Sequence, residues 1–255
     1  MMGWKAAGRA AEMARDRGVA VVTLRNCSHL GRLGEYSERI AGEGLVGFLT
    51  VNGQGGAQLV APYGGVERRL SVNPFSYGIP AADGAIIVDV SPTVVAGGKV
   101  AVKALRGERI PEGWVMDAEG YPTTDPNALA GPPAGSLMPL GGHKGFALGL
   151  VMDILAGALS GGGSSHPDPE RWGNATFLLA LDPEAFVGRE RFEAEVEDLL
   201  AYVRSSRVAP GFERVLIPGE PEREERERRG AEGIFVSDEA WRRIQATAAE
   251  VSRGV

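Results

Sequence analysis

His29 is the residue that its sequence surroundings best place for proton chemistry. It follows an apolar and β-branched run that begins at Val19 and changes to small polar residues at Asn26, a pattern typical of a buried strand that ends at a site. The chain has three histidines, and an imidazole titrates close to neutral pH. We therefore expect His29 to act as an acid or base. The alternative is a structural histidine bonded to a nearby carbonyl.

Lys144 is the second residue whose position indicates chemistry. It follows Gly141 and Gly142 and precedes a long apolar segment, 145–159, that we expect to be a helix. The ammonium and the first free N–H groups of that helix would meet at one point, which suits an anion. The alternative is a surface lysine whose stem covers the helix end.

Asp89 and Ser91 come at the end of a strand expected over 85–90. A carboxylate and a hydroxyl at this point could bind the hydroxyls of a ribose. The alternative is that they cap the helix expected after Pro92.

Cys27 is the single cysteine, which excludes an internal disulfide and fits a reducing compartment. Cys27 and His29 are two residues apart and could share one face of an extended chain, so a cysteine nucleophile is an alternative. Side chains at this spacing run parallel rather than converge. Ser28 points to the opposite face from its neighbour His29 and cannot pair with it.

The common nucleotide and metal motifs are missing from the sequence. Gly53-Gln54-Gly55-Gly56 lacks the third glycine of a dinucleotide fingerprint, and Gly98-Lys99 is followed by Val100 rather than by Ser or Thr. Three scattered histidines and one cysteine form no zinc pattern, so we expect no metal. A nucleotide would have to be held without a standard Rossmann or P-loop site.

Composition narrows the class of protein. The 255 residues are 44% hydrophobic and 24% charged, with a net charge of −6. No basic face is visible, which argues against a nucleic-acid partner. We find no apolar stretch of about 18 residues and no signal-peptide pattern, so we expect a cytoplasmic protein that does not bind membranes.

Strands and helices alternate along the chain, which predicts an α/β or α+β fold. We expect a long ordered loop over 107–139, and an exposed glycine-rich loop over 161–165 that leaves His166 exposed and without a role. The expected helices cover 6–17, 36–42, 93–105, 145–159, 189–204, 222–229 and a final segment capped by Ser237. The expected strands are one that starts at Val19 and ends before His29, and those over 45–51, 85–90, 175–181 and 215–217.

Several strings, taken in order, resemble the malate/L-lactate dehydrogenase-like family, a group that binds NAD(P) without a Rossmann fold. The resemblance covers nearly the whole chain. The matching strings are Asn26-Cys27-Ser28-His29-Leu30-Gly31, Pro62-Tyr63-Gly64-Gly65, Asn73-Pro74-Phe75, Ala96-Gly97-Gly98-Lys99, Ile110-Pro111-Glu112-Gly113-Trp114, Pro122-Thr123-Thr124-Asp125-Pro126, Pro139-Leu140-Gly141-Gly142-His143-Lys144-Gly145 and Pro218-Gly219-Glu220.

This resemblance implies a predominantly antiparallel or mixed sheet flanked by helices. It also implies a homodimer that uses NAD or NADP to interconvert a small 2-oxo acid and a 2-hydroxy acid. His29 matches the histidine that the family uses for acid–base catalysis. The positions that match its cofactor contacts are Gly53, Val88, Asp89, Val90, Ser91, Lys144, Gly145, Pro218, Gly219 and Glu220.

On this basis residues 1–255 form one catalytic unit, with 45–215 as the cofactor-binding core and 1–44 and 216–255 packed around it. Three departures stand out. Gly53 and His143 stand where family members usually have a serine-like residue and an aromatic residue. Family members also usually carry a further N-terminal helical region that binds the substrate carboxylate, and we expect this chain to start after it. An inactive fragment that binds cofactor is therefore the alternative function.

Overall fold

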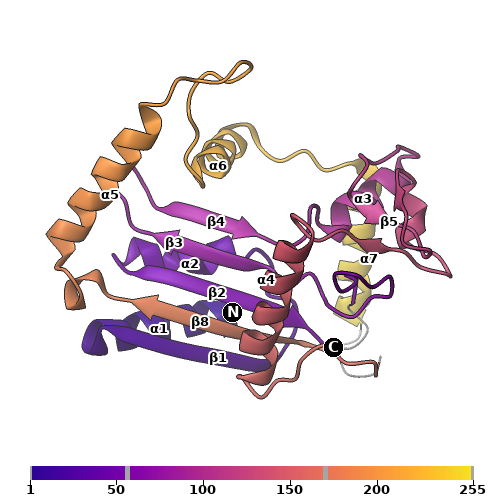
Figure 1. Cartoon of the computed structure of the whole chain (residues 1–255), viewed down its shortest axis with the longest axis horizontal. Coiled ribbons are helices and arrows are strands. Elements are labelled where there is room, and N and C mark those ends of the chain that lie inside the picture. Colours follow the sequence, from indigo (N-terminus) through magenta and orange to yellow (C-terminus); the bar gives the residue numbers. More distant parts are fainter. Residues whose placement is uncertain (1, 55–57, 169–171, 254–255) are drawn as a thin grey trace. The chain divides into compact units, whose positions relative to one another are not determined.

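The computed structural model describes residues 2–54, 58–168 and 172–253, in two compact units, Met1–Val215 and Leu216–Val255. The first unit contains a five-stranded sheet in the order β1-β8-β2-β3-β4 and a small sheet in the order β6-β5-β7 (Figure 1). All pairings within these sheets are antiparallel, and helices flank the larger sheet, as expected for the fold class. The strands are β1 (Val19–Cys27), β2 (Val46–Gly53), β3 (Phe75–Ile79), β4 (Ile86–Val90), β5 (Val115–Met116), β6 (Pro122–Thr123), β7 (Ser136–Leu137) and β8 (Asn174–Leu181).

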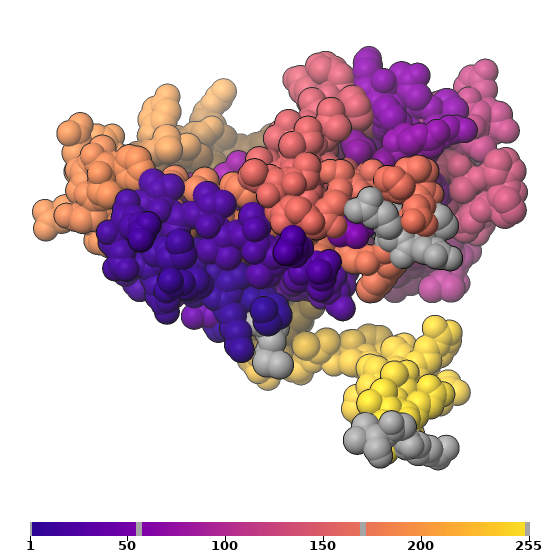
Figure 2. Space-filling view, turned by 90° about the horizontal axis from the view of Figure 1, so that it is seen from below, coloured from indigo at the N-terminus to yellow at the C-terminus, as the bar shows by residue number. Residues whose placement is uncertain are grey.

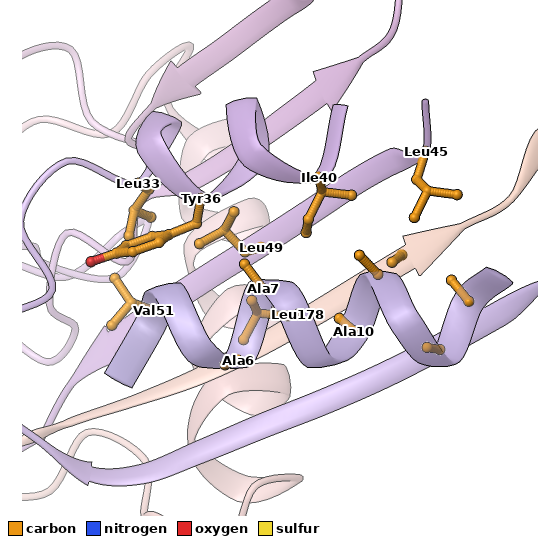
Figure 3. Packing of buried hydrophobic residues seen from close by; sticks show 14 residues of the cluster. Ala6, Ala7, Ala10, Leu33, Tyr36, Ile40, Leu45, Leu49, Val51 and Leu178 are labelled. Carbon is orange, nitrogen blue, oxygen red and sulfur yellow. The ribbon is translucent and has the colours of Figure 1, made fainter. Parts of the chain in front are cut away.

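Helices α1 (Met2–Arg17) and α2 (Gly34–Gly42) cover one face of the larger sheet. Helix α1 turns a row of alanines toward the strands, and these small side chains let the helix lie close to the sheet (Figure 3). Leu49 and Leu178 from β2 and β8 meet Tyr36 and Ile40 from α2 in this core. Burial of these side chains fixes which face of each strand points toward α1, because a slip of one residue would reverse every side chain.

The opposite face of the sheet is covered by α4 (His143–Asp153) and by a π-helical turn, η2 (Ile154–Ala158), that continues it. Met152 packs here against Phe48 and Phe177. These aromatic residues alternate along their strands with Leu49 and Leu178, as the period of two in a strand requires. The sheet therefore has two different cores on its two faces.

Strand directions place three chain segments at one edge of the sheet. Because β1 and β2 are both antiparallel to β8, and β2 and β4 are both antiparallel to β3, strands β1, β2 and β4 run the same way. Their carboxyl ends lie at the same edge, where their arrowheads point in Figure 1. We call this edge, where Cys27, Gly53 and Val90 end their strands, the site edge.

The rest of the first unit contains the small sheet, α3 (Gly97–Leu105), α5 (Arg189–Arg204) and the short helices η1 (Pro126–Leu129) and η3 (Pro183–Ala185). The second unit consists of α6 (Glu220–Glu232) and α7 (Asp238–Arg253). The Ser237 hydroxyl accepts a bond of 3.3 Å from the N–H of Ala240, which confirms the predicted cap of the last helix. Across the described residues, no helix has the length and apolar character needed to cross a membrane.

Three expectations about the elements were wrong. The segment 107–139 is not only a loop, because it contains η1 and the small sheet. The segment 215–217 is not a strand: it pairs with no described strand, and Leu216 is 42% exposed. Strand β3 lies in a stretch for which we predicted no regular element.

Candidate active site

A bulge at the end of β1 sets the position of His29. The pairing register between β1 and β8 shifts between Leu24 and Cys27, and Asn26 takes a left-handed φ of 58°. Bulges of this kind re-aim the chain next to active sites. His29 lies two residues beyond the strand and is exposed. It faces a cavity of about 410 Å³ lined by Met2, Leu24, Arg25, Asn26, Cys27, Ser28, His29, Leu30 and Tyr36.

One ring nitrogen of His29 is engaged by the backbone. Nδ1 accepts a hydrogen bond of 2.9 Å from the N–H of Gly31, so in the neutral imidazole the proton is on Nε2. A doubly protonated ring would turn Nδ1 into a donor, and the Gly31 contact must then open. The Tyr36 hydroxyl donates a bond of 2.6 Å to the carbonyl of Leu30 and ties this segment to α2. Nε2 is thus the atom of His29 that is available to a substrate.

Gly53 is brought close to the His29 segment by strand β8. Asn174 of β8 pairs with Cys27 on one side and with Gly53 on the other. Two strand spacings amount to about 10 Å. Gly53 is buried at the end of β2. The structure therefore brings together two positions that the sequence separates by 24 residues.

Lys144 lies in the first turn of α4 with an exposed side chain. Its ammonium makes no hydrogen bond or ion pair with a described residue and is therefore available to an anion. Two of the free N–H groups expected at this helix start are used within the turn. The N–H of Gly145 donates to Leu140 at 2.7 Å, and that of Lys144 to Gly141 at 3.4 Å. The ammonium therefore supplies the positive charge for an anion at this point.

Gly145 fixes the start of α4 against the chain that leaves β4. A Cβ at this position would lie 2.5 Å from the nitrogen and 2.6 Å from the oxygen of Leu140, and closer still to the Pro92 oxygen. Only a glycine allows this approach. Leu140 N–H also donates to Pro92 at 2.9 Å. Ser91 is therefore held beside the segment that carries Lys144.

Strand β4 presents its candidate residues to two different faces. The Asp89 Oδ2 accepts a bond of 2.8 Å from Gly34 N–H and lies 3.7 Å from Arg32 Nε. Asp89 thus caps α2 rather than the helix after Pro92. Val88 and Val90 alternate with it and point to the other face. One ligand lying on one face would meet the Asp89 side chain or the two valines, but not all three.

Ser91 follows β4 at the site edge, and its hydroxyl lies 2.7 Å from the hydroxyl of Thr93. The Thr93 hydroxyl in turn donates to the carbonyl of Val95 at 2.9 Å. Because the Thr93 proton is used in that bond, the Ser91 hydroxyl is the donor between the two. Its oxygen keeps an acceptor position for a ligand.

Pro218, Gly219 and Glu220 lie in the second unit at the start of α6. Gly219 has a left-handed φ of 98°, and the Glu220 carboxylate accepts a bond of 2.9 Å from Ile217 N–H. These contacts form the turn that begins the helix. Their part in cofactor binding stays a prediction.

A buried polar network next to Gly53 was not predicted from the sequence. Asp153 is 3% exposed and accepts bonds from Asn52 Nδ2 at 2.6 Å and from Ser165 N–H at 3.1 Å. Asn52 Nδ2 also donates to Gly163 at 2.9 Å. The network ties the end of β2 to the end of α4. The sequence did contain one sign of this network, because Asp153 is the single charged residue within the apolar segment 145–159.

Cys27 has the environment of an unreactive thiol. Burial raises its pKa above the ordinary value, and its Sγ lies 3.6 Å from the Arg25 carbonyl. Reactive cysteines have a lowered pKa, so this geometry argues against the cysteine-nucleophile alternative. Among the described residues, no three His, Cys, Asp or Glu side chains are grouped so that they could hold a metal ion.

Comparison with known proteins identifies the class. Residues 1–245 match the family model described as malate/L-lactate dehydrogenase. The L-lactate dehydrogenase of Cupriavidus necator is 39% identical over 251 residues, which cover 96% of this chain and 72% of that protein. The malate dehydrogenase of Pyrococcus horikoshii is 36% identical over 231 residues, covering 86% of this chain and 63% of that protein.

Solved structures agree with these matches. The sulfolactate dehydrogenase of Methanocaldococcus jannaschii superimposes with a TM-score of 0.85 at 32% identity, over 98% of this chain and 72% of that one. The malate dehydrogenase of Pyrococcus horikoshii gives a TM-score of 0.84 at 31% identity, over 98% and 70%. The fold and the matches define the class of NAD(P)-dependent 2-hydroxyacid dehydrogenases. The chain belongs to the malate/L-lactate dehydrogenase family, which confirms the resemblance found in its sequence.

Proposed function

We propose that this chain interconverts a small 2-hydroxy acid and the corresponding 2-oxo acid with NAD or NADP, and that His29 is its acid–base residue. The observation that carries the proposal is the site edge. There His29 faces a cavity, and Gly53, Ser91 and the unpaired Lys144 lie at or beside the same edge. The relatives named above are dehydrogenases of lactate, malate and sulfolactate.

His29 fits the proton step of such a reaction. When a 2-oxo acid is reduced, negative charge develops on the ketone oxygen, and a donor at Nε2 can neutralise it. In the reverse direction the same atom takes the proton from the hydroxyl group. Both steps need a ring that carries a proton on Nδ1, so the Gly31 contact, which keeps the resting proton on Nε2, must open when the ring reacts. Because the Gly31 N–H holds Nδ1, the ring is oriented with Nε2 away from the backbone.

The described residues fit a dinucleotide in charge and in placement. A bound NAD(P) supplies hydride transfer. Lys144 offers an unpaired ammonium to a phosphate, and the Ser91 oxygen can accept a hydrogen bond from a ribose hydroxyl. These contacts, like Gly53, lie within residues 45–215, which we propose as the cofactor-binding core. One oxygen of the Asp89 carboxylate already accepts a hydrogen bond from Gly34 at the start of α2. We therefore expect Asp89 to bind a ribose more weakly than a carboxylate without such a bond would.

The test compares turnover with cofactor binding. We expect His29→Ala to lower kcat by roughly 10²–10⁴ and to leave the Kd of NADH and NADPH unchanged. Oxidation of either cofactor is followed at saturating pyruvate, oxaloacetate and sulfopyruvate. Ser206→Ala is the control, because Ser206 follows α5 and does not line the His29 cavity.

Two results would refute this assignment. His29→Ala with full activity would remove His29 from the chemistry, and a large loss of cofactor affinity would make it a structural residue. Cofactor binding with no turnover on any of the three acids would favour the inactive cofactor-binding alternative. Measuring the Kd by fluorescence in the same samples separates these outcomes.

We further propose that two copies associate through the face of the sheet that carries α4. A row of side chains crosses this face from Val21 through Leu179 and Phe48 to Tyr77. Its outer members are open to solvent, because Val21 is 46% exposed and Tyr77 39%. Within η2, Ile154 is 50% exposed on the helix that partly covers this face. An uncharged apolar surface of this kind fits a second copy of itself.

The oligomeric state tests this surface. We expect light scattering to give twice the chain mass of 26.9 kDa and Val21→Glu to give the single chain mass. Val102→Glu is the matched control, because Val102 on α3 is similarly exposed, at 45%, and lies elsewhere. A monomeric parent chain, or a Val21→Glu dimer, would overturn the proposal.

A further inference from the structure

A second cavity of about 400 Å³ lies in the first unit and shares no lining residue with the His29 cavity. Its volume is within the range of small-molecule sites. The lining residues are Gln58, Arg68, Arg69, Ser165, His166 and Pro167. Two arginines and a histidine give this cavity a positive and donor-rich lining.

Arg68 contributes a positive charge that no described carboxylate neutralises. Its Nε donates to the Gly135 carbonyl and its Nη2 to the Leu129 carbonyl, both at 2.6 Å. These bonds hold the half-buried guanidinium in place and leave Nη1 without a described partner. Burial lowers the pKa of Arg68 through desolvation. A fixed and partly desolvated cation gains more from an anion than a solvated one does.

Arg69 differs from Arg68 because its charge is paired. Its Nη2 contacts the Glu67 carboxylate, and its Nη1 donates to the carbonyl of Arg68 at 2.8 Å. Among these three charged groups, one positive charge therefore remains. It is the charge of Arg68.

Ser165 and His166, which lie in the loop that follows η2, add hydrogen-bond donors to the lining of this cavity. The Ser165 Oγ is buried and has no hydrogen-bond partner among the described residues. Such an atom costs free energy unless a ligand satisfies it. His166 Nδ1 accepts a bond of 3.1 Å from Asp168 N–H, which leaves the proton of the neutral ring on Nε2. His166 Nε2 is therefore a free donor at the cavity, and the Ser165 hydroxyl is an unpaired donor buried in the cavity wall.

The loop that carries these donors is held in place from both sides. Gln58 Nε2 donates to the His166 carbonyl at 2.9 Å, and Ser165 N–H donates to the buried Asp153. Earlier in the same loop, Gly161 lies against Arg25. The space-filling view shows the indigo surface of the N-terminal segment next to the salmon surface around residue 160 (Figure 2). A positioned loop loses little entropy on binding.

We propose that this cavity binds a phosphate-type oxyanion through Arg68, Ser165 and His166. The guanidinium Nη1, the Ser165 hydroxyl and the His166 Nε2 supply three donors of different geometry around one excess positive charge. Oxyanions are bound by such sets, with the guanidinium as the strongest member. The site stands apart from the His29 cavity and does not depend on the dehydrogenase activity.

The primary test uses inorganic phosphate and the whole chain. We expect calorimetry at constant ionic strength to show saturable binding. Arg68→Gln and His166→Ala should each weaken it, the first about tenfold or more, as the loss of a charged hydrogen bond implies. Ser165→Ala should weaken it about threefold, because a neutral bond is lost. Arg106→Gln is the matched control, since Arg106 is an arginine outside the cavity.

A second arm identifies the source of the oxyanion. If Arg68→Gln weakens the binding of NADPH and leaves the binding of NADH unchanged, the cavity binds the additional phosphate group of NADPH. If it weakens inorganic phosphate alone, the site takes a free anion. Both results support the site. The proposal would be overturned if the parent chain showed no saturable binding of phosphate, or if the Arg68 and His166 variants bound phosphate as tightly as the parent chain does.

Arg68→Gln also removes support from two carbonyls, so the variant could fail to fold. Circular dichroism checks this directly. His166→Ala and Ser165→Ala keep the test decisive in that case, because neither side chain makes a bond to the small sheet.

Discussion

Gly145 gives the sharpest test of how α4 is placed. In Gly145→Ala the new methyl group would overlap three rigid backbone atoms of Pro92 and Leu140. Overpacking of this kind costs typically 1–3 kcal/mol, and the rigid neighbours place the value at about 3 kcal/mol. Alanine has a higher helix propensity than glycine, which offsets about 1 kcal/mol of this cost. The net expected loss in the free energy of unfolding is therefore about 2 kcal/mol.

Thermal unfolding measures this change. For a chain of this size, about 2 kcal/mol corresponds to a Tm lowered by about 4–8 °C. We also expect weaker binding of NADH, because the shift separates Lys144 from Ser91. Gly98→Ala is the matched control: Gly98 is in the first turn of α3, and a Cβ there meets no atom within 4 Å. This variant should gain about 0.5–1 kcal/mol.

The opposite ranking would refute the reasoning. If Gly145→Ala is as stable as the parent chain or more stable, the close approach between α4 and the Pro92 segment does not exist. If Gly145→Ala and Gly98→Ala both lose stability, the cost comes from the glycine change itself and not from overpacking.

Two further predictions concern residues near Gly53 and His29. Asn52→Leu leaves the buried Asp153 carboxylate with only its Ser165 bond, so we expect a loss of about 3 kcal/mol in urea unfolding. Changing Asp153 to Leu in that variant should recover part of the loss, and no recovery would contradict a buried-charge cost. Cys27→Ala should keep full turnover. Because burial raises the Cys27 pKa, iodoacetamide at pH 8 should alkylate this thiol more slowly than glutathione, as mass spectrometry can show; faster alkylation would contradict the raised pKa.

The sequence predicted best the parts of the fold that rest on local patterns. The helix expected over 189–204 has these bounds in the structure, and the strand expected over 175–181 starts one residue earlier. The first segment has an amphipathic helical pattern that begins after Gly188, and the second is a short apolar run that ends at Asp182-Pro183. His29 was also predicted to follow a strand end, which the structure confirms.

Features that depend on distant contacts could not be predicted in this way. Strand β3 is five residues long and exists because β2 and β4 pair with it on both sides. The strands of the small sheet are only two residues long, too short to show a period. Conversely, the apolar segment 215–217 has no neighbour to pair with among the described residues, and an apolar run alone does not make a strand.

The candidate site shows the same division. Residue type and order indicated His29 and Lys144 as candidate site residues. They did not indicate which of their atoms have no hydrogen-bond partner in the folded chain. The partner of Asp89 is Gly34, 55 residues away in the chain. The carbonyls of Leu140 and Gly141 accept hydrogen bonds from the N–H groups of Gly145 and Lys144. These bonds depend on a tight turn, and the sequence does not give the geometry of that turn.

The common direction of β1, β2 and β4 also decides where this chain tolerates change. The far edge of the sheet holds the turn 81–84 between β3 and β4 and the turn 43–45 before β2. A loop lengthened there, or a reporter peptide inserted at 81–84, changes the chain a full strand length away from His29, Gly53 and Ser91. Insertions at the far edge therefore leave the site edge in place, and what they disturb instead is the contact of the 81–84 turn with α5, where Ala82 N–H donates to Glu197.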